Sequence, residues 1–332
     1  MAGVVLSVTT GSVSGASSNL TITGGATATA TFTGQQAPIV SLTDSNGVWN
    51  IALSGTVVVR RNNGGSVAPV FPNTNSGTTT SWHYQQSAGL GVVTDLGVYQ
   101  NTTEAILQTN DMNSGIENLF INAGSPTAVA SNVERLDFIF PSGMVVSADR
   151  GFAVFERGGP TGGANGPFQV AAIRSLDMAN DPSDYGPLLA IAQNSYSRGL
   201  SDPPLRTAQL YDVYRQDGTT GPNSADLEWR QGNLGPQEIG GRLIQLTELG
   251  NPGDVIYGFS MFAIDVTGVG TELVDWNNPT FFPQDTPSGG ALSGDMDLVT
   301  IGAQLFVIPE PASLLLLVAG GGWMLRARRP GR

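Results

Sequence analysis

The stretch that decides the fold reads Glu134-Arg-Leu-Asp-Phe-Ile-Phe140, and similar short apolar segments follow it at 151–156 and 168–175. Turn-forming clusters separate these segments, among them Gly158-Gly159-Pro160. Short apolar runs that are bounded by glycine and proline predict β-strands, and no helical segments alternate with them. The sequence therefore predicts antiparallel sheets rather than a parallel sheet whose strands are connected by helices.

The composition extends this prediction to the whole chain. Its 332 residues include 44 Gly and 20 Pro, which supply many turns, and only 13% are charged, so long helices with charged outer faces are not expected. The segment 103–113 is the best helix candidate. Further strands are expected at 26–33, 48–59, 91–99, 117–122, 188–192, 208–214, 241–246, 255–266 and 298–308.

The predicted fold class is all-β, with one or two antiparallel β-sandwich units of jelly-roll-like form and a short hydrophobic helix at the C-terminal end. The loop-like stretch 123–131 is the best boundary, because the composition shifts there from Thr, Ser and Asn towards apolar runs. We expect a Thr/Ser/Gly-rich β unit at 1–123, a sandwich unit at 132–308 and a terminal segment at 309–332. One large sandwich is the alternative to two units.

The terminal segment has three parts: Pro309-Glu310-Pro311, an apolar run at 312–325, and an arginine-rich end. Fourteen residues form a helix of about 21 Å, which is short of the ~30 Å hydrocarbon core, so the run suits a temporary membrane span better than a permanent one. The arginines should stay in the cytoplasm, which places the residues before Pro309 outside. A buried strand or helix with a basic end is the alternative. The arginines are Arg326, Arg328, Arg329 and Arg332.

In the order and spacing of its parts, this segment resembles the PEP-CTERM sorting signal of bacterial proteins. The resemblance implies that an exosortase, a membrane-embedded protease, processes the chain near Pro309-Glu310-Pro311 and delivers it to the cell surface or the extracellular matrix. The body also resembles uncharacterised β-rich surface domains of PEP-CTERM proteins, and these have no established catalytic residues to carry over. That second resemblance rests on 134–140, 155–159, 168–173 and 254–262.

The beginning of the sequence does not fit this picture. Residues Met1 to Val8 carry no charge, and their apolar run is too short for the core of a secretory signal peptide. We expect that a signal peptide is missing from this sequence. The alternative is that residues 4–8 are simply the first strand.

Charge and composition exclude several functions. The chain has no Cys and no Lys, so disulfides, thiolate metal sites, Schiff-base chemistry and a P-loop lysine are excluded. Residues 1–308 hold eleven Arg and twenty-six acids, a net charge of −15, which disfavours nucleic acid and anionic lipid as partners. Divalent cations or cationic matrix components suit such a surface better, although solubility alone also explains it.

Two weaker site predictions concern calcium and carbohydrate. Asp177, Asp181 and Asp184 place oxygen donors in one loop, and Asp295 and Asp297 do so in another, so Ca²⁺ is a candidate cofactor. Neither loop has EF-hand spacing, and Asp as a turn former is the alternative.

Exposed tryptophans could stack on sugars, and exopolysaccharide is therefore a candidate partner. Trp276, in the polar turn 273–279, is the first candidate and Trp229 is the second. Tryptophan that packs in the core or at its rim is the commoner alternative in sandwiches.

No catalytic residue is predicted. His83 is the only histidine, and no Gly-x-Ser-x-Gly motif accompanies it. A glycosidase could use two of Glu134, Asp137 and Glu156, but acids that only pair with neighbouring arginines are commoner. We therefore expect an exported, non-enzymatic structural or binding protein of the cell surface or biofilm matrix. A carbohydrate-binding adhesin, with or without calcium, is the first alternative, and a secreted glycan hydrolase is the second.

Overall fold

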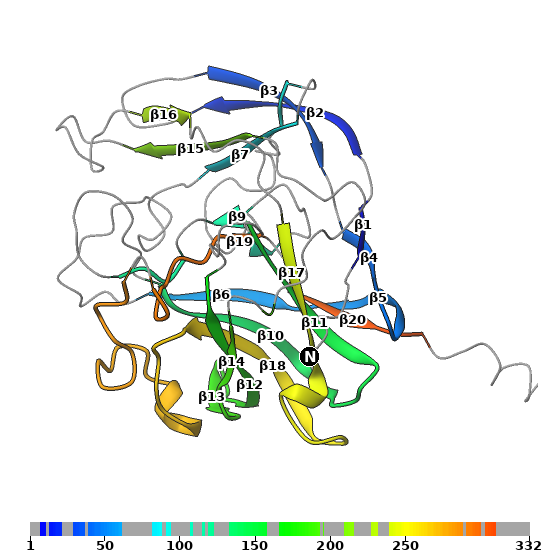
Figure 1. The fold of residues 1–332 in the computed structure, drawn as a ribbon, viewed down its shortest axis with the longest axis vertical. Coiled ribbons are helices and arrows are strands. Elements are labelled where there is room, and N and C mark those ends of the chain that lie inside the picture. The colour runs from blue at the N-terminus through cyan, green and yellow to red at the C-terminus, as the bar shows by residue number, and fades with distance from the viewer. Residues whose placement is uncertain are drawn as a thin grey trace, which may run out of the picture.

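The structure is a computed structural model. It describes residues 7–10, 13–21, 29–36, 39–61, 82–87, 91–93, 107–108, 115–116, 119–122, 133–157, 166–192, 195, 209–215, 227–231, 239–287, 290–299 and 303–309. These residues are mostly β, and their two largest sheets are antiparallel (Figure 1).

The first sheet has eight strands, and β11 is its hub. β11 pairs with β20 at its beginning, with β19 at its end, and with β17 on the other side. The strand order is β1-β4-β5-β20-β11-β19-β9, with β17 joined to β11. The bounds are β1 (Ser7–Thr10), β4 (Ile39–Asp44), β5 (Gly47–Ser54), β9 (Gly115–Ile116), β11 (Arg150–Arg157), β17 (Ile239–Gln245), β19 (Leu298–Val299) and β20 (Gln304–Val307).

The second sheet has six strands in the order β13-β12-β18-β10-β6, with β14 joined to β12. Its long central strands are apolar along most of their length, as expected for strands that lie in a core. The bounds are β6 (Thr56–Arg61), β10 (Val133–Val145), β12 (Phe168–Leu176), β13 (Pro182–Tyr185), β14 (Leu189–Ile191) and β18 (Val255–Ala263).

Two smaller antiparallel sheets and two short 3₁₀ helices complete the described structure. The order of the four-stranded sheet is β16-β15-β7-β8, and β2 pairs with β3. The bounds are β2 (Val13–Thr21), β3 (Thr29–Gln36), β7 (Trp82–Ser87), β8 (Gly91–Val93), β15 (Gln209–Arg215), β16 (Leu227–Gln231), η3 (Leu246–Glu248) and η4 (Gly270–Leu273).

Aromatic rings join the two large sheets. Phe138 of β10 and Phe259 of β18 are directly opposite each other in register and stack with their centroids 4.7 Å apart. Phe152 of β11, in the other sheet, lies 4.3 Å from Phe259. All three side chains are almost completely buried. Burial of such large apolar rings provides much of the free energy that holds two sheets face to face.

Most of the predicted strands are confirmed, but 48–59 is not one strand. It forms β5 and β6, which belong to different sheets, and Gly55 lies between them. A Cβ at residue 55 would lie 2.6 Å from the Ile139 carbonyl oxygen, so only glycine fits where the chain crosses from one sheet to the other.

Three other predicted strands differ from the structure. Residues 119–122 are not a strand, because the Leu119 and Phe120 amides donate to carbonyls of the loop 294–296 instead of a ladder. The segment 255–266 stops being a strand at Ala263, and 298–308 divides into β19 and β20. Of the predicted helix 103–113, only residues 107–108 are described.

Strand pairing crosses the predicted boundary at 123–131. β5 pairs with β20, and β6 pairs with β10. Strands from 1–123 and from 132–308 therefore lie in the same two sheets.

Of the terminal segment, only Pro309 is described, and it is exposed. Glu310, Pro311, the apolar run, Arg326, Arg328 and Arg329 lie outside the described residues. Within the described ranges, no helix combines the length and apolar character that a membrane crossing requires.

Candidate functional site: a buried arginine–aspartate network

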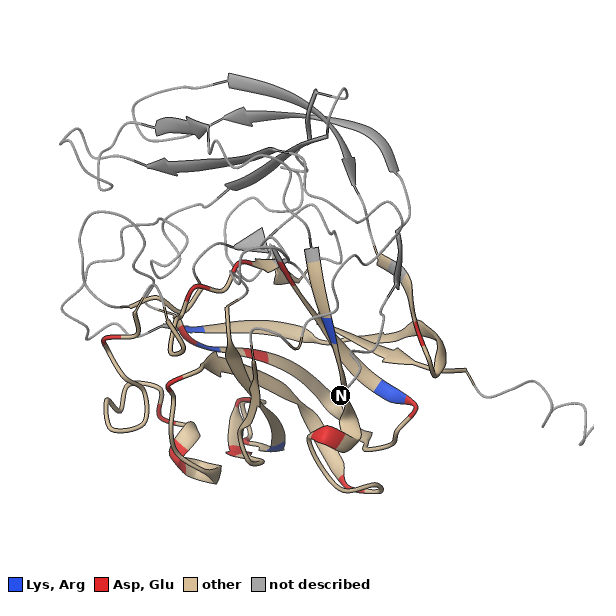
Figure 2. Ribbon diagram, in the orientation of Figure 1, with Lys and Arg blue, Asp and Glu red and all other residues tan. Residues whose placement is uncertain are grey.

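The second sheet places charged side chains in its interior. Figure 2 shows that the acids of the described residues lie mostly on loops and strand ends, so charges within β10 are an exception. Arg135 and Asp137 are two residues apart on β10 and therefore project from the same face. Arg60 lies opposite Arg135 on β6, and Ser260 lies opposite Asp137 on β18.

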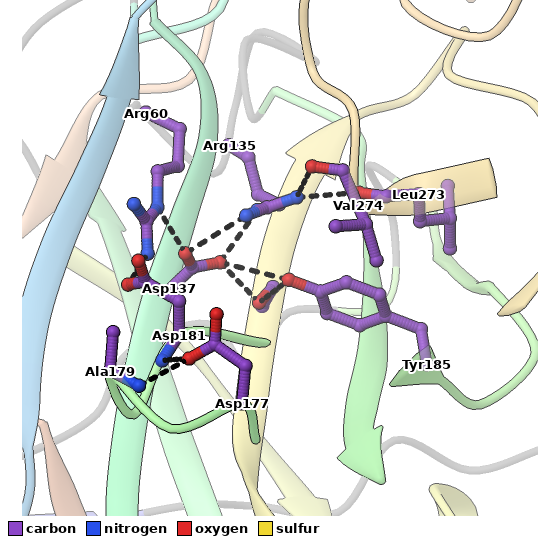
Figure 3. Close-up of polar contacts among 10 residues, drawn as sticks. Arg60, Arg135, Asp137, Asp177, Ala179, Asp181, Tyr185, Leu273 and Val274 are labelled. Carbon is purple, nitrogen blue, oxygen red and sulfur yellow. Dashed lines mark hydrogen bonds and ion pairs between the residues drawn. The ribbon is translucent and has the colours of Figure 1, made fainter. Parts of the chain in front are cut away.

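The Asp137 carboxylate is the centre of the network (Figure 3). It accepts hydrogen bonds from Arg60 Nε at 2.7 Å, Arg135 Nε at 2.7 Å and Arg135 Nη2 at 3.2 Å. The Ser260 hydroxyl donates to Oδ1 at 2.6 Å, and the Tyr185 hydroxyl from β13 donates to the same oxygen at 3.2 Å. Both Asp137 and Arg135 are buried, with exposed fractions of 0% and 1%. We call these five residues the Asp137 network.

Two arginines decide the charge state of this aspartate. Burial by itself would raise the pKa of Asp137, but the positive charges of Arg135 and Arg60 outweigh burial and hold this pKa below its usual value. Burial, followed by the charge of Asp137, raises the pKa of the Tyr185 hydroxyl. Asp137 is therefore ionised and Tyr185 neutral at neutral pH.

The network also fixes the chain that follows β18. Arg135 Nη1 donates to the carbonyl oxygens of Leu273 and Val274, next to η4. The guanidinium carbons of Arg60 and Arg135 each lie 5.0 Å from the centroid of the Trp276 ring. Trp276 is partly buried against the core, so the predicted sugar-stacking residue packs on the network. The Trp229 side chain lies outside the described residues.

The first predicted calcium loop makes contacts typical of a turn. Asp177 Oδ1 accepts the Ala179 amide at 2.8 Å and the Asp181 amide at 2.9 Å. Asp181 forms an ion pair with Arg60, and Asp184 lies on β13. These contacts match the turn-forming alternative for Asp177.

The second predicted calcium loop lies against β11. Glu156 is 0% exposed, and its Oε1 accepts the Gly166 amide at 2.6 Å. Burial, and after it the charges of Asp297 and Asp295, raise the pKa of Glu156 well above its usual value. Across the residues that the structure describes, no three His, Asp or Glu side chains gather in a geometry that could hold a metal ion.

A second polar cluster surrounds Glu134, which is only 2% exposed. Its Oε1 accepts Gln284 Nε2 at 3.1 Å and Asn122 Nδ2 at 3.4 Å. Burial raises the pKa of Glu134 to about 8, and the nearby charge of Asp265 acts in the same direction. Asn122 also binds the backbone near Gln284, since its Oδ1 accepts the Thr286 amide at 2.6 Å.

The three acids considered for a glycosidase thus belong to three different clusters. On β10, Glu134 accepts hydrogen bonds from Gln284 and Asn122, whereas Asp137 accepts them from Arg60 and Arg135. Glu156 lies in the other sheet. His83 lies on β7, and its side chain is outside the described residues. Each described cluster connects a strand to a loop.

Sequence reasoning missed the Asp137 network as a unit. Its only local signal was the Arg-x-Asp spacing inside an apolar strand, where two charges on one face cannot both remain in water. Arg60, Tyr185 and Ser260 are distant in sequence and gave no signal. Comparison with protein-family models, curated proteins and solved structures gave no match.

Proposed function

We propose that this chain is an exported, exosortase-sorted protein of the cell surface or extracellular matrix, with a non-enzymatic structural or binding role. In this proposal the two sheets form a β-sandwich of jelly-roll-like form, and residues 309–332 form a short membrane helix that is removed. The membrane contact is then transient, and the partner that processes the chain is an exosortase.

One observation carries the proposal. β20 ends at Val307, and exposed Pro309 follows two residues later. β20 is an internal strand, paired with β5 on one side and β11 on the other. Cleavage at Pro309-Glu310-Pro311 would therefore leave every described strand intact and would begin at an exposed residue, Pro309.

The buried acids support the non-enzymatic part. Asp137 forms ion pairs with two arginines, and Glu134 and Glu156 accept hydrogen bonds from amide groups inside the protein. In these contacts the three strongest acid candidates hold strands and loops together, as a structural role would require.

The test is to fractionate the native host and determine the mature C-terminus by mass spectrometry. We expect the wild-type protein in the envelope or extracellular fraction, with a C-terminus near residues 309–311. A variant with Pro309→Ala, Glu310→Ala and Pro311→Ala should keep its arginine-rich end. Purified 1–308 provides the folding control and should melt at the temperature of the full chain. An intact arginine end on a soluble intracellular protein would disprove the proposal.

A carbohydrate-binding role is the second candidate, and the position of Trp276 favours it. The ring is only partly buried, and it lies beside Arg60, whose partner Asp181 has a side chain that is 49% exposed. A glycan array and calcium titration calorimetry on residues 1–308 test this role. If neither experiment detects binding, the carbohydrate-binding role is excluded and the structural role remains.

A further inference from the structure

The segment 264–287, which we call the strap, joins β18 to the loop at 290–297. Apart from η4 it contains no regular element. Two neighbouring residues of β10 hold it. Arg135 donates to the carbonyls of Leu273 and Val274, and Glu134 accepts the side-chain amide of Gln284. Both anchors lie at the end of β10 where its pairing with β6 is irregular, between Val133 and Arg135.

The Arg135 anchor does not respond to pH. Arginine stays protonated at every pH at which proteins are folded, and Asp137 is ionised from mild acid upwards. The Arg135 guanidinium is 1% exposed and also contacts the Trp276 ring. Residues 273–276 are therefore fixed independently of protonation.

The Glu134 anchor has a different chemistry. Within the described part of the chain, Glu134 Oε1 accepts hydrogen bonds from the neutral amides of Gln284 and Asn122. The charge of the strap that acts on Glu134 is that of another acid, Asp265. Asp265 Oδ2 accepts the Thr286 hydroxyl at 2.8 Å, while its Oδ1 is buried and has no hydrogen-bond partner. Asp285, also on the strap, acts on Asp265 as a further negative charge.

Protonation of Glu134 therefore determines whether the closed position of this end of the strap is stable. With the proton, the buried Glu134 side chain is a neutral carboxyl held by two amides. Without the proton it is an anion buried near Asp265, and the contacts described above bring no cation to compensate its charge. The negative charge of Asp265 therefore favours opening once Glu134 is ionised.

We propose that Glu134 is the proton-operated latch of the strap: the protonated side chain keeps residues 282–287 closed against β10, and its ionisation releases them while Arg135 retains residues 273–276.

The sign and size of the effect follow from linkage. In the closed strap burial raises the pKa of Glu134 to about 8, and in the open strap water returns this pKa towards its ordinary value of 4.5. The open form binds fewer protons, so opening becomes more favourable as the pH rises. The opening constant should grow about tenfold per pH unit between roughly pH 5 and 8, and should level off above that.

Hydrogen–deuterium exchange of the purified full chain at about pH 5.5, 7 and 8.5 tests the latch, with each amide expressed as a protection factor against its intrinsic rate. In the wild type, protection at residues 284–286 should fall about tenfold per unit in the lower interval. Glu134→Gln keeps both amide contacts without a titrating group and should show no such fall. Asp149→Asn, at an exposed turn, is the matched control and should behave as the wild type.

Two outcomes would overturn the proposal: a pH dependence that persists in Glu134→Gln, or an equal loss of protection in β11 and at 273–276, which would mean global loosening. Asp265→Asn provides a second variant should Glu134→Gln fail to fold. Removal of the neighbouring charge lowers the pKa of Glu134, so the fall should level off at a lower pH than in the wild type. An unchanged profile in Asp265→Asn would also count against the latch.

Discussion

Replacement of Asp137 by Asn should destabilise this protein severely. The substitution keeps the size of the side chain but removes the carboxylate that forms ion pairs with both Arg60 and Arg135. Arg135 is 1% exposed and would remain as a buried, uncompensated cation. Loss of one partner of a buried ion pair costs about 3–5 kcal/mol of unfolding free energy. We expect the loss to stay in this range although two arginines lose a partner, because the Arg60 side chain is 12% exposed and can recover part of its hydration.

Urea unfolding followed by far-UV circular dichroism measures this loss, with Asp149→Asn as the control that should change stability by less than about 0.5 kcal/mol. The pH dependence provides a second check. The pKa of Asp137 is lowered by folding, so its stabilisation is present above the unfolded pKa and disappears as the pH falls through the folded pKa. The difference between wild type and Asp137→Asn should therefore shrink in acid. A loss below about 1 kcal/mol at neutral pH would refute the assigned role of the network.

Three further predictions concern buried groups. Glu134→Gln should raise the unfolding free energy by about 3 kcal/mol at pH 7. With its pKa of about 8 the folded side chain stays mostly protonated at that pH, whereas unfolding lets it ionise with a pKa near 4.5, about 2.5 units lower than the pH, at 1.36 kcal/mol per unit. A stability difference that does not grow between pH 5 and 8 in urea titrations would contradict it. Phe259→Ala removes the ring between Phe138 and Phe152 and should cost about 3–5 kcal/mol by chemical denaturation, whereas a cost below about 1 kcal/mol would show that these rings do not join the sheets. Gly258→Ala should prevent the native pairing of β10 and β18, because Gly258 has φ +129° and a Cβ there would lie 1.9 Å from the Phe138 carbonyl oxygen. If the variant melts at the wild-type temperature, that close approach is disproved.

The strands were predictable where the sequence carries a local signal. Segments such as 134–140, 151–156 and 168–175 are apolar and end at glycine or proline clusters, and all three are strands. Their partners were not predictable, because pairing of β5 with β20 depends on residues about 250 positions apart and leaves no local pattern. For the same reason the composition change at 123–131 suggested a division that the strand pairing crosses.

The candidate site was less accessible to prediction. Glu134, Asp137 and Glu156 were recognised as acids of interest, but charged residues are usually exposed, and only the structure shows these three as buried. Their burial depends on partners from other elements, such as Arg60 for Asp137 and Gln284 for Glu134. Single-sequence reasoning cannot identify such partners, so it also could not show that Trp276 packs against guanidinium groups.

The internal position of β20 has a consequence for the order in which this protein is made. One of the two neighbours of β5 consists of residues 304–307, which are synthesised about 250 residues later, so the first sheet cannot be completed until those residues have left the ribosome. Until then, the long nascent polypeptide lacks a strand that lies inside its largest sheet, and folding that depends on such distant contacts is slow. Under the proposed export, this late pairing keeps the first sheet incomplete while the chain is threaded through a translocation pore.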